Sequence, residues 1–185
     1  MNQQTRAYLF LSKKQVTLAS LVATAALTIV LWKIDAMIDP SGKGMTGLQL
    51  AFTFEQAQAL LSTWSAGGAE LYRETAWLYY LYAVSIAFLL ASAPVYFARQ
   101  RSGFNPGAVP LLDAVFSMVP FAACLCDWVV QSLMLAFISG ANTGDSLVRA
   151  LSIASIAKWV LLAFCLVILL RSYFTTRKDR ARART

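Results

Sequence analysis

Two charged residues, Asp127 and Lys158, lie inside long apolar runs of this 185-residue chain. Asp127 falls in the run 111–138, and Lys158 falls in the next run, 147–170. The turn that joins the runs is centred at 142–143, so each charge lies about 15.5 residues, or roughly 23 Å of helix, from that centre. In an antiparallel helical hairpin the two charges reach the same depth. They are therefore expected to form a buried ion pair. Such a pair can fix helix packing, transfer a proton or bind a ligand.

Heptad spacing places further polar side chains beside the pair. Gln131 lies one turn after Asp127 on one predicted helix, and Ser155 shares a seam with Lys158 on the other. Gln131 and Ser155 are therefore expected to add hydrogen bonds. A charge at mid-membrane costs ~2.5–3.5 kcal/mol, which favours pairing inside a bundle. Two interpretations stay open: a salt bridge that fixes helix packing, and a proton-linked or ligand-binding site.

The residue inventory excludes several other kinds of site. The chain has no His, which excludes His-based metal sites and His general bases. Cys124 and Cys126 lie two residues apart on a predicted helix, where side chains point about 200° apart and cannot form a disulfide. Cys165 also lies in a predicted span. With no phosphate-binding glycine loop, nucleophile elbow or zinc motif, we expect no metal, no cofactor and no catalytic residue.

The composition is that of a membrane domain. Hydrophobic residues make up 58% of the chain and charged residues 14%, against about 25% charge in soluble domains. The net charge of +7 comes largely from Lys and Arg at the ends of apolar runs, which indicates membrane topology rather than nucleic-acid binding. The expected partners are the lipid bilayer and either another membrane protein or a second copy in a homodimer.

The predicted fold is an all-α membrane protein, with four transmembrane helices in a bundle plus one short amphipathic extracytoplasmic helix. A basic cytoplasmic N-terminus covers 1–15, a single transmembrane domain covers 16–170, and a basic disordered tail covers 171–185. The four expected spans are 16–32, 76–98, 111–138 and 147–170.

The segment between the first two spans predicts the short outer helix, at about 54–64. Thr53 is a suitable N-cap, and Gln56 three residues later completes a capping box. Phe54, Leu61 and Trp64 fall on one apolar face. This helix either caps the bundle or acts as a lid over a substrate site.

The positive-inside rule predicts the orientation. The N-terminus, the 99–107 loop and the tail hold eleven Lys and Arg, and the opposite side holds four. Both termini are therefore expected in the cytoplasm. The outer helix and the 139–146 turn are expected on the other side.

Three motifs carry a resemblance: LQLAFT-x-E-x-A-x-x-L-L-x-x-W at 48–64, Asp127 with Gln131 four residues later, and the triplet Ala157-Lys158-Trp159. They resemble a group of small bacterial four-helix membrane proteins of unassigned function. That group has an acidic residue followed by Asn in the third span, where this chain has Val130-Gln131. The resemblance implies a bacterial inner membrane, no particular activity, and an outer loop that forms one unit with the ion pair.

Three functions remain as hypotheses. The first is a non-enzymatic membrane protein with an accessory or assembly role, or one that binds a lipid-like ligand beneath its outer helix. The second is a small proton-coupled transporter that uses Asp127 and Lys158. The third is a membrane enzyme acting on a lipid or isoprenoid, which is disfavoured because a carboxylate neutralised by Lys is a poor general base.

Overall fold

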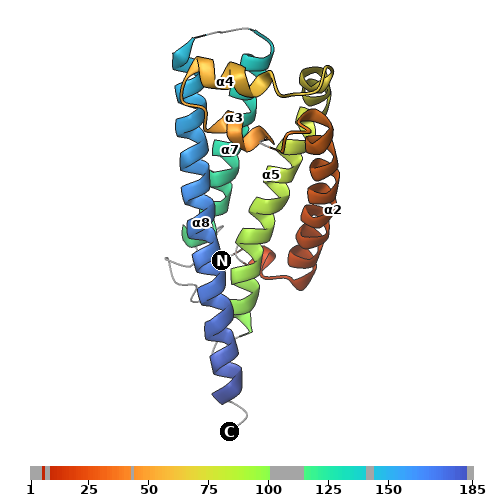
Figure 1. Ribbon diagram of the computed structural model, residues 1–185. Coiled ribbons are helices and arrows are strands. Elements are labelled where there is room, and N and C mark those ends of the chain that lie inside the picture. The colour runs from red at the N-terminus through yellow and green to blue at the C-terminus, as the bar shows by residue number, and fades with distance from the viewer. Residues whose placement is uncertain (1–5, 7–8, 43, 101–114, 141–143, 183–185) are drawn as a thin grey trace. The chain divides into compact units, whose positions relative to one another are not determined.

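A computed structural model describes residue 6 and residues 9–42, 44–100, 115–140 and 144–182. All regular structure in these residues is helical. The helices are α2 (Lys14–Ile38), α3 (Gly44–Gln49), α4 (Phe54–Leu61), α5 (Gly68–Arg99), α7 (Val119–Ile138) and α8 (Asp145–Arg182), as Figure 1 shows.

Four of these helices, α2, α5, α7 and α8, are long and apolar enough to cross a membrane. Their surfaces carry exposed large apolar side chains, among them Val22 on α2, Leu125 on α7 and Val160 on α8. Exposed apolar surface on this scale is typical of a lipid-facing protein. The all-helical fold with four membrane-length helices agrees with the sequence prediction.

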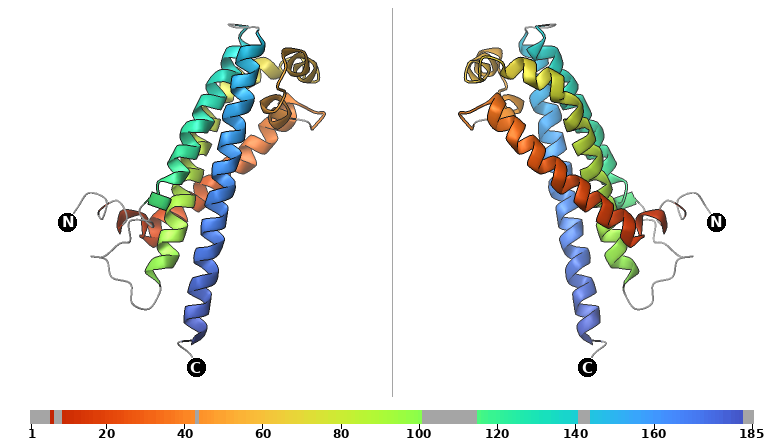
Figure 2. Two further views of the ribbon diagram at one scale, coloured as in Figure 1. Left: turned by 90° about the vertical axis from the view of Figure 1, so that its left-hand side faces the viewer. Right: turned by 90° about the vertical axis from the view of Figure 1, so that its right-hand side faces the viewer.

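The chain folds as two compact units, and each of the four long helices contributes to both. Unit 1 comprises Met1–Thr24, Val84–Cys124 and Val160–Thr185. Unit 2 comprises Ala25–Ala83 and Leu125–Trp159, and it contains the whole of α3 and α4. Within unit 2, α7 and α8 run side by side in opposite directions (Figures 1 and 2).

Unit 2 has the larger buried apolar cluster, to which all six helices contribute. Leu48 of α3, Tyr72 of α5, Met134 of α7 and Leu151 of α8 are all fully buried there. The short helix α3 is therefore part of this core, because Met45 is buried as well.

Unit 1 is held by a smaller cluster and by polar contacts. Leu11, Ala91 and Val95 form the buried cluster. The rings of Phe88 and Phe121 meet edge to face at a centroid distance of 5.3 Å.

The helix α4 begins where its capping signal predicts. Thr53 Oγ1 accepts the hydrogen bond from the Gln56 backbone N–H, which satisfies one free donor of the first turn of α4. The helix ends at Leu61 rather than at 64, with Ser62 as its C-cap. The preceding turn from α3 passes through Phe52, whose φ of 49° is in the left-handed region.

The helix ends differ most from the predicted spans. The helix α2 continues to Ile38 instead of ending at 32, and α5 begins at Gly68 instead of 76. The sequence predicts a third span from 111, but α7 begins at Val119. Pro120 fits this start, since a residue without an N–H is accommodated at least cost in the first turn of a helix. Residues 111–114 lie outside the described residues, as does the centre of the predicted 139–146 turn.

The prediction of a disordered tail from 171 is wrong for the described residues, because α8 continues as a helix to Arg182. The high charge of RSYFTTRKDRAR is the feature that favours disorder. Arg, Lys and Ala are, however, good helix formers, and basic residues near a helix C-terminus interact favourably with its dipole. The helix therefore extends beyond its apolar part.

Gly68 allows two chain segments to approach closely at the start of α5. A Cβ at this position would lie 2.7 Å from the Ile38 carbonyl oxygen. The Ser65 backbone N–H donates to that same oxygen at 2.8 Å. The end of α2 and the start of α5 are therefore joined through backbone contacts that need a glycine.

Candidate functional site

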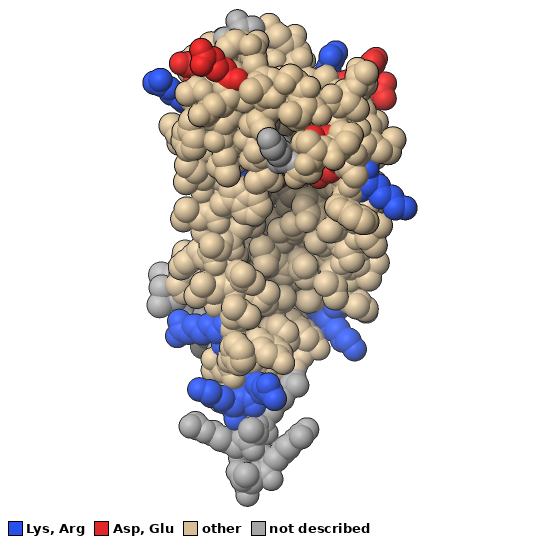
Figure 3. All heavy atoms as spheres, viewed as in Figure 1, with Lys and Arg blue, Asp and Glu red and all other residues tan. Residues whose placement is uncertain are grey.

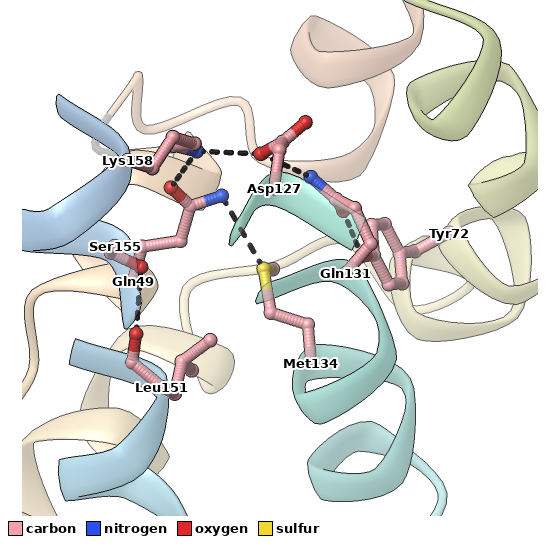
Figure 4. Close-up of polar contacts among 8 residues, drawn as sticks. All are labelled: Gln49, Tyr72, Asp127, Gln131, Met134, Leu151, Ser155 and Lys158. Atoms are coloured by element: carbon pink, nitrogen blue, oxygen red, sulfur yellow. Dashed lines mark hydrogen bonds and ion pairs between the residues drawn. The ribbon is translucent and has the colours of Figure 1, made fainter. Parts of the chain in front are cut away.

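A polar cluster is buried in unit 2, and four helices supply its members (Figure 4). Asp127 and Gln131 come from α7, Lys158 from α8, Gln49 from α3 and Tyr72 from α5. The side chains point toward one another in a connected chain of hydrogen bonds.

The ion pair lies at the centre of this cluster. Lys158 Nζ donates to Asp127 Oδ1 at 2.8 Å. The Lys158 side chain is 8% exposed and the Asp127 side chain 14% exposed, so both charges are largely removed from the surface. The structure thus brings together the two charges that the helical spacing places at one depth.

A second oxygen ligand for the ammonium comes from α3. Gln49 Oε1 accepts a hydrogen bond from Lys158 Nζ at 3.0 Å, and Gln49 Nε2 donates to Met134 Sδ at 3.5 Å. Gln49 is 5% exposed. The sequence pattern does not single this residue out. The sequence does contain one indication of its role, because Gln49 lies between two leucines in LQLAF. A single amide in an apolar segment is typical of a buried polar side chain that has a hydrogen-bond partner.

Gln131 extends the cluster toward α5. Its Nε2 group is 3.5 Å from Asp127 Oδ1, and its Oε1 accepts the Tyr72 hydroxyl hydrogen bond at 2.6 Å. Tyr72 is fully buried. The prediction includes Gln131 but not Tyr72, because Tyr72 precedes the predicted second span.

Ser155 does not join the cluster in the expected way. It is fully buried, but its hydroxyl donates to the Leu151 carbonyl at 2.8 Å, one turn earlier on α8. The expected hydrogen bond to the ion pair is therefore wrong, because a serine inside a helix readily donates to the carbonyl four residues before it.

Two tryptophans flank the pair differently. Lys158 Nζ lies 5.0 Å from the centroid of the Trp159 ring, within range of a cation–π contact. Trp128 instead donates from Nε1 to the Tyr80 carbonyl at 3.2 Å. Trp159 is thus an additional favourable contact for the ammonium.

The contacts of Lys158 fit a structural ion pair better than a catalytic group. The ammonium has a carboxylate, an amide oxygen and an indole ring around it. Asp127 Oδ1 accepts from both Lys158 and Gln131, whereas Oδ2 accepts from no described residue and points away from the other labelled side chains in Figure 4. Among the described residues, no three His, Cys, Asp or Glu side chains are grouped as metal ligands.

The predicted lid residues are seated on the core of unit 2. Phe54 meets Phe137 edge to face at 5.9 Å, and Trp64 packs against Tyr72 at 6.0 Å between ring centroids. Leu61 is partly buried against the same cluster. The Phe54 backbone N–H also donates to Asp145 Oδ1 at 2.8 Å.

Unit 2 has a second polar feature, which the sequence pattern does not predict. Tyr79 donates from its hydroxyl to Asp35 Oδ1 at 2.5 Å. Asp35 also lines an open cavity of about 420 Å³, together with Trp32 and Asp39. In Figure 3, the acidic side chains in view lie in separate places on unit 2, with basic side chains beside them.

Compared with protein families, curated proteins and solved structures, the chain shows no match.

Proposed function

We propose that this is a non-enzymatic integral membrane protein with an accessory or assembly role, in which the polar cluster holds α3 and α4 as a fixed recognition surface. The proposed location is a bacterial inner membrane, with both termini in the cytoplasm and α3 and α4 on the outer side. The proposed partner is another membrane protein.

One observation carries the proposal: Lys158 Nζ bonds Asp127 of α7 and Gln49 of α3 together. An interior ammonium with two oxygen ligands strongly favours one arrangement of the three helices, because moving α3 would leave a buried charge with one partner fewer. Two further hydrogen bonds hold the segment that contains α3 and α4 against α8. Ser152 Oγ accepts from the Phe52 backbone N–H at 3.2 Å, and Asp145 accepts from Phe54.

The experiment is native mass spectrometry of the full chain, extracted gently from its own membrane. The expected result is a stoichiometric protein partner, which is lost from Gln49→Leu. The matched control is Gln100→Leu, since Gln100 lies in unit 1 and outside the cluster. Wild-type protein that carries no protein partner contradicts the proposal, and so does Gln49→Leu that retains the partner fully.

A proton-coupled transporter is the second candidate, because Asp127 Oδ2 accepts no hydrogen bond from the described residues. A carboxylate oxygen with spare capacity inside a membrane helix is a typical proton acceptor. In proteoliposomes, this function predicts internal acidification or alkalinisation on substrate addition, and its loss in Asp127→Asn. Unchanged internal pH with every substrate class tested argues for the accessory role.

A further inference from the structure

Unit 1 is strongly basic. It holds eleven Lys and Arg and two Asp, a net charge of +9, whereas unit 2 holds five Lys and Arg and seven Asp and Glu, a net charge of −2. The two acids of unit 1, Asp113 and Asp179, lie outside the described side chains. The ligand that suits this unit is therefore an anion.

An open pocket, called the concavity below, lies within this basic unit between α5 and α8. It has a volume of about 340 Å³ and is lined by Phe97, Tyr173, Thr176 and Arg177. Thr176 Oγ1 donates to the Phe97 carbonyl at 3.0 Å, which ties the two walls together. The Phe97 and Tyr173 rings meet edge to face at 5.7 Å.

Arg177 gives this concavity its charge. Its guanidinium is exposed, and it makes no hydrogen bond or ion pair with any described residue. A guanidinium presents several N–H donors in a planar fork that fits a phosphate group. Next to it, the Tyr173 ring offers the amphipathic surface that aromatic residues provide at a membrane interface.

The same helix continues from this concavity into apolar surface. Leu166, Val167 and Leu170 precede Tyr173 by one to two turns, and all three are exposed. An anion bound at Arg177 would therefore lie beside a surface suited to acyl chains. This continuity favours a phospholipid over a nucleic acid or an acidic protein, neither of which needs an apolar track.

We infer that the concavity formed by Phe97, Tyr173, Thr176 and Arg177 binds the phosphate headgroup of an anionic phospholipid, whose acyl chains follow α8. The inference rests on the proposed membrane placement of the four helices, but not on the partner of α3 and α4. Basic pockets between transmembrane helices are suited to such headgroups.

The test is native mass spectrometry of the full chain released from nanodiscs that contain equal parts of phosphatidylglycerol and phosphatidylcholine. Wild-type protein should retain phosphatidylglycerol preferentially. Arg177→Gln should lower that retention about fivefold, the effect expected for one basic residue near a lipid surface. The matched control is Arg171→Gln, another exposed arginine of α8 that does not line the concavity.

Equal retention of both lipids by the wild type would overturn the inference. Equal losses in Arg171→Gln and Arg177→Gln would also overturn it, since they would show attraction by the overall charge and no specific site. Should Arg177→Gln fold poorly, Arg177→Lys keeps the charge without the planar fork and should lose part of the preference. The Gln49→Leu experiment tests separately whether α3 and α4 bind a protein partner. The lipid preference measured here does not depend on whether that partner is found.

Discussion

At the scale of single residues, the ammonium of Lys158 is the group that links α8 to both α7 and α3. It accounts for the position of Asp127 on α7 and of Gln49 on α3, because both side chains turn toward it. A buried charge is costly to leave without a partner, so the removal of either partner should destabilise the fold.

The pair can be tested by comparing one substitution with two. Asp127→Asn should lower the free energy of unfolding by about 3–5 kcal/mol, because Lys158 then lacks a counter-charge. Asp127→Leu combined with Lys158→Leu should recover most of that loss. SDS titration in mixed micelles measures both values. A double variant as unstable as the single one would contradict the interpretation of the pair as a salt bridge that only fixes helix packing.

The hydrogen bond between Tyr72 and Gln131 calls for a double-mutant cycle. Tyr72→Phe should cost about 1–3 kcal/mol, because it leaves the buried Gln131 Oε1 without its donor at 2.6 Å. In a Gln131→Leu background the same change should cost much less, since no acceptor remains. Equal costs in both backgrounds, measured by the same SDS titration, would mean that the two side chains are energetically independent.

The ion pair could be predicted from sequence because a helix has a regular rise, so depth follows from residue counting. Gln131 followed for the same reason, since one helical turn separates it from Asp127. Gln49 and Tyr72 could not be found this way. The position of Gln49 depends on where a short, non-periodic segment folds back, which no spacing rule specifies.

At the scale of elements, the segment from Asp39 to Gly67 is held at both ends and in its middle. Its ends meet at the backbone bond between Ser65 and Ile38, and its middle is tied to α8 through Ser152 and Asp145. Both α3 and α4 are too short to be stable alone, so these contacts determine their position.

Adjacent glycines provide a matched test of the closest approach. Gly68→Ala should destabilise by about 1–3 kcal/mol, because its Cβ would meet the Ile38 carbonyl oxygen at 2.7 Å. Gly67→Ala should be neutral or slightly stabilising, since a Cβ at position 67 would have nothing within 4 Å. Thermal unfolding in detergent compares the two. Similar melting temperatures would show that the backbone at this junction can move apart.

The bond from α4 to α8 can be separated from a nearby ion pair. Asp145→Ala should cost about 1–2 kcal/mol, because Phe54 loses the acceptor of its backbone N–H. Arg149→Ala should change stability by no more than about 0.5 kcal/mol, since its contact with Asp145 is exposed and 3.8 Å long. Limited proteolysis of the 39–67 segment should be faster only in Asp145→Ala. Faster cleavage in both variants would assign the effect to the ion pair.

The number and order of the long helices could be predicted because apolar runs of this length are unambiguous. The helix ends could not, since they depend on local features that hydropathy does not describe. Pro120 delays the start of α7, and helix-forming basic residues carry α8 to Arg182.

At the scale of the whole molecule, charge is distributed unevenly between the units, with +9 in unit 1 and −2 in unit 2. In a membrane protein the orientation follows the Lys and Arg near the ends of the spans, and unit 1 holds eleven of these residues against five in unit 2. A fluorescent protein fused after residue 185 should therefore be fluorescent in cells, and alkaline phosphatase fused there should be inactive. Alkaline phosphatase inserted between α7 and α8 should be active. The reverse pattern would overturn the proposed topology.

The contacts of α3 and α4 also have a consequence for biosynthesis. Lys158 follows Gln49 by 109 residues, and Ser152 follows Phe52 by 100. A ribosome that adds ~5–20 residues per second makes Gln49 roughly 5–20 s before Lys158 exists. The segment is therefore synthesised well before its binding site on α8 exists. The contacts with α8 can form only after that helix has been made, and a chain stopped before Ser152 would lack the acceptor of the Phe52 N–H and the Lys158 contact with Gln49.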